Sequence, residues 1–160
     1  NECLNKALFH DNLPAVELLI DKGADLKEVD SREGLPVPFM LANFANLEVL
    51  SYLFDKKKYF SSNIELSDGS NLLHHACTDD FNDDDSLRLN MVKYLLKIGV
   101  NPNKQDNSGN TPLHIACGNE NDPEDLIIVL INHSANPDLK NEDGQDPNGI
   151  LLTTHNVSLG

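Results

Sequence analysis

The stretch from Gly109 to Cys117 constrains the fold most, because it predicts a short helix with a well-defined start. It reads Gly-Asn-Thr-Pro-Leu-His-Ile-Ala-Cys. Thr111 can cap a helix through its hydroxyl, and Pro112 stands in the first turn, where a missing N–H costs nothing. Leu113 and Ala116 then lie three residues apart and share one face of the helix.

A second helix is predicted directly after the first. Asp122 and Pro123 repeat the capping arrangement, and an apolar stripe follows over residues 126–131. The helix is expected to end near Ser134, before a polar loop with Gly144 at its tip. Two helices and a loop make one unit that cannot bury its own apolar face, so the chain needs further copies of it.

Copies of the unit are found along the whole chain. The loop glycines Gly34, Gly69, Gly109 and Gly144 are separated by 35, 40 and 35 residues. We therefore expect a single array over residues 1–160, which we interpret as a fragment of a larger protein. The expected units are 1–29, 30–66, 67–104, 105–139 and a partial or capping unit, 140–160.

Three units depart from the pattern. In the second unit, residues 58–60 lack the glycine that Gly23 supplies in the first, so its second helix must close less favourably or run on. The third unit contains an acidic insertion, 78–86, before a second helix predicted over 89–98. The fifth loses the pattern after Pro147, which leaves both a terminal cap and a truncated repeat open.

The Thr-Pro-Leu-His-Ile-Ala run, with its second helix and loop glycine, resembles the ankyrin repeat, whose period is about 33 residues. The resemblance covers about residues 1–147. It implies an all-α ankyrin-repeat solenoid of stacked antiparallel helix pairs with hairpin-like loops. It also implies that His74 and His114 hydrogen-bond to the backbone of adjacent loops.

Composition narrows the class of partner. The net charge of −14 and a pI near 4.5 disfavour nucleic acid and anionic membranes, which are bound through Lys and Arg. A partner protein, basic in character, fits better. No apolar run reaches the length of a membrane span and no signal peptide precedes the array, so we expect it in the cytoplasm or nucleus. We also expect the array to be monomeric. Cys77 and Cys117 are expected to be buried small residues in a reducing compartment.

No catalytic, cofactor or metal site is expected. The acidic insertion supplies oxygen ligands, but counted from Asp79 the sixth and twelfth positions of an EF-hand loop hold Asp84 and Asn90 instead of Gly and Glu. A solvated loop or a contact for a basic partner fits the insertion better than a calcium site does. The sequence also lacks a phosphate-binding glycine loop and the common hydrolase motifs.

The resemblance implies that a partner contacts the loop tips and the exposed side of the first helices. The corresponding loop positions are Arg32, Leu35, Asp68, Ser70, Ser108, Asn110, Asp143 and Gln145. The corresponding helix positions are Phe9, His10, Phe44, Ala45, Thr78, Asp79, Gly118 and Asn119. Phe9 and Phe44, 35 residues apart, are expected to stack in neighbouring units as an interface pair, although either ring could instead lie under a loop.

Two further expectations come from the resemblance. Asn101 and Asn136 each follow a leucine by six residues, an arrangement seen in ankyrin substrates of an asparaginyl hydroxylase; the alternative is that both make loop hydrogen bonds. The expected function is a non-enzymatic protein–protein interaction module. The alternative is the targeting part of a larger enzyme or of a translocated bacterial effector, which would act in the host cytosol.

Overall fold

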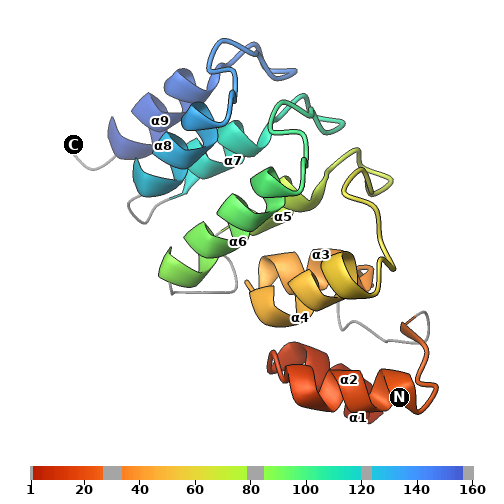
Figure 1. The fold of residues 1–160 in the computed structure, drawn as a ribbon. Helices are drawn as coiled ribbons and strands as arrows, with labels where there is room; N and C mark the ends of the chain where they lie inside the picture. Colours follow the sequence, from red (N-terminus) through yellow and green to blue (C-terminus); the bar gives the residue numbers. More distant parts are fainter. Residues whose placement is uncertain (1, 27–33, 79–84, 120–123, 157–160) are drawn as a thin grey trace.

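The computed structural model describes residues 2–26, 34–78, 85–119 and 124–156. Within these ranges the regular structure is helical, apart from one isolated bridge between Glu65 and Asn71. Figure 1 shows helix pairs stacked in one direction, with the hairpin loops projecting from the same side. The helices are α1 (Glu2–Phe9), α2 (Leu13–Asp21), α3 (Val37–Asn43), α4 (Leu47–Ser51), the π-helix η2 (Tyr52–Lys56), α5 (Leu72–Ala76), α6 (Asp85–Lys97), α7 (Pro112–Gly118), α8 (Glu124–Asn132) and α9 (Pro147–Asn156).

The helices pack in two layers. Each first helix contacts its own second helix in the pairs α1–α2, α3–α4, α5–α6 and α7–α8. Neighbouring units join through α3, α5, α7 and α9 in one layer and through α2, α4, α6 and α8 in the other. The all-α prediction with pairwise packed helices is confirmed. Aliphatic residues fill a continuous core, in which Leu8, Leu41, Leu72 and Leu130 are completely buried.

The helix starts follow the predicted capping chemistry. The Thr111 hydroxyl accepts from the His114 N–H at 3.4 Å, and Pro112 opens α7. Asn71 does the same for α5, where its Oδ1 accepts from the Leu73 N–H at 3.0 Å. Each of these side chains satisfies amide groups that a helix start leaves without a partner.

Where the sequence departs from the pattern, the structure changes locally. Gly23 adopts a φ of 92°, whereas the second unit continues from α4 into η2 and places the non-glycine Lys58 at a φ of 52°, as the missing glycine predicted. The predicted start of α6 at residue 89 was wrong. The helix begins at Asp85, because this acidic residue of the insertion is favourable in a first turn.

The fifth unit forms a helix despite its degenerate sequence. The Asp146 carboxylate accepts from the Gly149 N–H at 2.8 Å, and Pro147 opens α9, which packs against α7. The predicted cap at Asp122 and Pro123 and most of the acidic insertion lie outside the described residues. None of the helices in the described ranges combines the length and apolar character that a bilayer crossing requires.

Buried polar side chains connect one unit to the next. Asn46, which is 8% exposed, donates from Nδ2 to the carbonyl oxygens of Leu8 and Phe9 at 2.7 and 3.2 Å. A side chain of the first unit likewise bonds to the backbone of the second, since the Asp11 carboxylate accepts from the Val49 N–H at 2.9 Å. The end of α1 and the start of α4 therefore depend on each other for their hydrogen bonds.

We predict that Asn46→Ala lowers the free energy of unfolding by about 2 kcal/mol, because it leaves the buried Leu8 carbonyl without a donor. Urea denaturation followed by circular dichroism measures the change. Asn90→Ala makes the same chemical change at an exposed position of α6 and serves as the control. Equal losses in the two variants would show that the bond between units contributes nothing to stability.

Candidate partner-binding surface

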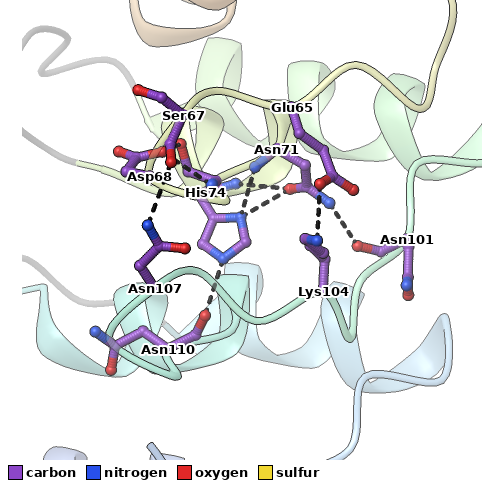
Figure 2. Close-up of polar contacts among 10 residues, drawn as sticks. Glu65, Ser67, Asp68, Asn71, His74, Asn101, Lys104, Asn107 and Asn110 are labelled. Atoms are coloured by element: carbon purple, nitrogen blue, oxygen red, sulfur yellow. Dashed lines mark hydrogen bonds and ion pairs between the residues drawn. The ribbon is translucent and has the colours of Figure 1, made fainter. Parts of the chain in front are cut away.

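The hairpin loops are joined to one another through their backbones. The Asn107 N–H donates to the Asp68 carbonyl at 2.7 Å, and the Glu142 N–H donates to the Ser108 carbonyl at 2.9 Å. Side chains add to this contact, since Asn107 also donates from Nδ2 to Ser67 at 3.2 Å (Figure 2). Three successive loops thus form one connected edge.

The two motif histidines bond to the loop that follows them, as the resemblance implied. His74 Nε2 lies 3.0 Å from the Asn110 carbonyl, and His114 Nε2 lies 3.1 Å from the Gln145 carbonyl. A carbonyl can only accept, so Nε2 must carry the proton in both rings. Nδ1 of His74 is then free to accept from the Asn71 N–H at 3.1 Å (Figure 2). The neutral form of His74 therefore suits this pair of bonds.

Carboxylates lie at the loop edge. Hydrogen bonds from the hydroxyl and the N–H of Ser70, at 2.7 and 2.9 Å, lower the pKa of Asp68, so this group is charged at neutral pH. Asp106, Glu142 and Asp143 lie in the next two loops. Lys104 is paired with Glu65 at 2.8 Å and offsets little of this charge. The edge of the described loops is predominantly acidic.

Phe9 and Phe44 form the aromatic pair that the sequence predicted. Their ring centroids are 5.2 Å apart and their planes are inclined at 64°, an edge-to-face geometry favoured by aromatic rings. Both side chains are half-buried, so each keeps an accessible edge where α1 and α3 end. The neighbouring His10 is exposed.

A shallow hollow lies farther along the same row of first helices. It has a volume of about 340 Å³ and is open to solvent. It runs along α7 and is flanked by the end of α5 and the first part of α9. Its lining residues are Thr78, Asn110, His114, Ile115, Gly118, Asn119 and Ile150. Sequence reasoning selected Thr78, Asn110, Gly118 and Asn119 but missed Ile115 and Ile150. The available signal was the change from Phe9 and Phe44 to the small residues Thr78 and Gly118 at equivalent positions.

The other predicted positions differ in the solvent exposure of their side chains. Ser70 and Asn119 were expected to be accessible, but each is only 5% exposed, because Ser70 bonds to Asp68 and Asn119 donates to the Cys77 carbonyl at 2.9 Å. Ala45 is also buried. Leu35 is half-buried. Positions that remain exposed are Asp68, Ser108, Asp143 and Gln145, whereas Arg32 and Asp79 lie outside the described residues.

Both candidate hydroxylation sites are exposed and take part in turns. Asn101 Oδ1 accepts from the Asn103 N–H at 2.9 Å, and Asn136 Oδ1 accepts from the Asp138 N–H at 3.0 Å. These bonds are the loop role that we considered as the alternative. Hydroxylation of either residue stays a prediction.

The buried cysteines are poorly suited to nucleophilic chemistry. Burial raises the pKa of Cys77 to about 12 and that of Cys117 to about 11, so both thiols are protonated at neutral pH. Both are buried, as the sequence predicted. Among the described residues, no three His, Cys, Asp or Glu side chains are grouped as a metal site requires.

Comparison with known proteins identifies the repeat. Residues 73–131 match the family model for ankyrin repeats, many copies. These residues run from α5 to α8. Together with the bonded hairpin loops and pairwise helices, the match identifies residues 73–131 as ankyrin repeats.

Three relatives show how the similarity is distributed. An ankyrin repeat protein of Acanthamoeba polyphaga mimivirus is 36% identical over 69 residues, 43% of this chain and 16% of its own length. The Inhibitor of Apoptosis OPG037 of Variola virus is 26% identical over 139 residues, 87% of this chain and 29% of its own length. Human Protein phosphatase 1 regulatory subunit 27 is 40% identical over 63 residues, 39% of this chain and 40% of its own length. The chain thus spans less than half of each relative.

We predict that Gly109→Ala destabilises the array more than Gly144→Ala does. Both glycines have nearly the same φ, 75° and 76°, so placing alanine in this conformation costs the same, roughly 1 kcal/mol, at each position. Only at Gly109 would a Cβ also meet the next loop, 2.8 Å from the Glu142 nitrogen. The difference between the two urea midpoints isolates the contact between loops, and equal midpoints would contradict it.

We also predict that stability falls as the pH drops below 6.5. Burial lowers the pKa of His74 and of His75, and for His74 it outweighs the opposing effects of Asn110 and Asp106. Between pH 7.5 and 5.5 the unfolded chain therefore binds more protons than the folded chain. The free energy of unfolding consequently decreases as the pH is lowered over this range.

The variant His74→Gln removes one of these two histidines and is expected to flatten this pH dependence. Denaturation midpoints measured across the pH range give the slope for each protein. His10→Gln changes an exposed histidine and is the matched control. A slope in His74→Gln equal to that of the unmodified chain would exclude His74 as the source.

Proposed function

We propose that this chain is a non-enzymatic protein-binding module that receives a partner protein on the face formed by the loop tips and the first helices. The observation that carries the proposal is the edge-to-face pair of Phe9 and Phe44, which are half-buried on neighbouring units. Aromatic side chains held at the centre of a surface supply much of the energy of protein interfaces. The whole array, residues 1–160 with the five units given above, would form one such module.

Two features of the loops support this role. Their backbone contacts, such as Asn107 to Asp68 at 2.7 Å, hold the tips in fixed positions, which reduces the entropy lost when a partner binds. Their carboxylates and the net charge of −14 favour a basic partner and oppose nucleic acid or anionic membrane. The human relative is named as a regulatory subunit, which also agrees with binding to another protein.

The setting of the proposed module follows from the same features. Buried free thiols such as Cys77 and Cys117 suit a reducing compartment, the cytoplasm or nucleus. We propose that the array acts as a monomer, with any catalytic activity of the complete protein residing outside it.

The test is affinity capture with the unmodified array and with the Phe9→Ala, Phe44→Ala double variant, followed by identification of the partner and measurement of its affinity. We expect at least tenfold weaker binding by the double variant, because two aromatic anchors are lost. Phe60→Ala is the matched control, since Phe60 is also half-buried and pairs with Phe54 at 5.9 Å. Circular dichroism verifies that all three proteins are folded. A partner that binds every variant equally would contradict the proposed face.

A further inference from the structure

One register position on the first helices changes character along the array. Phe9 and Phe44 occupy it in the first two units, and Thr78 and Gly118 occupy the equivalent position in the next two. The two rings pack against each other, 5.2 Å apart, and fill their part of the row. The hollow of about 340 Å³ lies where the row continues without rings.

The walls of the hollow combine apolar surface with hydrogen-bond acceptors. Ile115 of α7 and Ile150 of α9 supply aliphatic surface, and both are half-buried. The Thr78 hydroxyl donates its proton to the His75 carbonyl at 3.0 Å. Asn119 Nδ2 donates to the Cys77 carbonyl at 2.9 Å. The side-chain oxygens of Thr78 and Asn119 can still accept hydrogen bonds, which suits donors on an incoming chain.

The charged groups near the hollow also favour a partner that carries donors, because they are mainly negative. Asn110, which lines it, belongs to the loop of Asp106, whose carboxylate accepts from the Asn110 N–H at 2.9 Å. Asp68 lies in the loop before, and its lowered pKa keeps it ionised. The cation Lys104 is paired with Glu65. A segment rich in Lys or Arg is therefore attracted to this part of the surface.

We propose that the hollow is an anchor site for one large apolar side chain, aromatic or branched aliphatic, carried by a basic segment of the partner protein. The incoming side chain would extend the row that Phe9 and Phe44 begin, with the flanking Lys or Arg residues beside the acidic loops. This inference rests on the proposed function and assigns part of the partner's chemistry.

The test uses Gly118→Phe, which supplies the missing ring from the chain itself. A Cβ at this position would lie 3.8 Å from Ile150 Cγ2, an ordinary contact, so the backbone accepts a side chain. Gly118→Ala is the control, because it adds the Cβ and leaves most of the hollow open. Gly118→Met is a flexible substitute should circular dichroism show that the phenylalanine variant is unfolded.

The probes are short synthetic peptide pools in which a central residue is flanked by random mixtures of Lys, Arg, Ser and Gly. One pool has Leu or Phe at the centre, and the other has Ala. A third pool replaces Lys and Arg with Asp and Glu around the apolar centre. Nuclear magnetic resonance of the labelled array follows the amide signals of Ile115, Gly118 and Ile150 during titration.

We expect saturable shifts at these amides with the basic, apolar-centred pool and at least tenfold weaker binding with the Ala-centred pool, as burial of a Leu or Phe side chain predicts. Gly118→Phe should abolish the shifts and Gly118→Ala should retain them. The proposal would be overturned if the Ala-centred or the acidic pool bound as tightly as the basic, apolar-centred pool. It would also be overturned if no amide at the hollow shifted, or if folded Gly118→Phe still bound. Shifts confined to Phe9 and Phe44 would overturn the anchor site alone and leave the proposed function standing, whereas failure of the double-variant capture experiment would count against the proposed function itself.

Discussion

Hydrogen bonds from buried side chains to the backbone of a neighbouring unit are the interaction on which the rest of the structure depends. Helices as short as α5 and α7 are marginal alone, and each leaves terminal backbone groups without partners. Asn46 supplies donors to the end of α1, and Asn119 supplies one to the Cys77 carbonyl after α5. Apolar burial drives the stacking, but it is not directional, so these bonds set how one pair sits on the next.

The same principle extends to the loops. His74 serves its own helix through Nδ1 and the next loop through Nε2, so one ring couples the start of a helix to the position of a hairpin (Figure 2). The carboxylates at the tips are then presented from a connected edge instead of from separate loops. A continuous surface arises from this arrangement, because no single unit contains it.

Local chemistry explains which features could be predicted from sequence. The cap at Thr111, the burial of Cys77 and Cys117, and the irregular end of the second unit all depend on residues close in the chain. The pairing of Phe9 with Phe44 was also predictable, because a regular period places equivalent residues side by side. The start of α6 was missed, since an acidic residue such as Asp85 suits both a loop and a first helical turn.

The sequence by itself determined the repeat, the all-α class and the row of equivalent positions along the first helices, because period, caps and side-chain size are local properties. The tertiary structure decided which members of that row are accessible. Ser70 and Asn119 are buried by bonds to groups that the alignment does not reveal, including a carbonyl in the preceding unit. The hollow likewise requires Thr78, Ile115 and Ile150 from three successive units, so it exists only when those units are stacked.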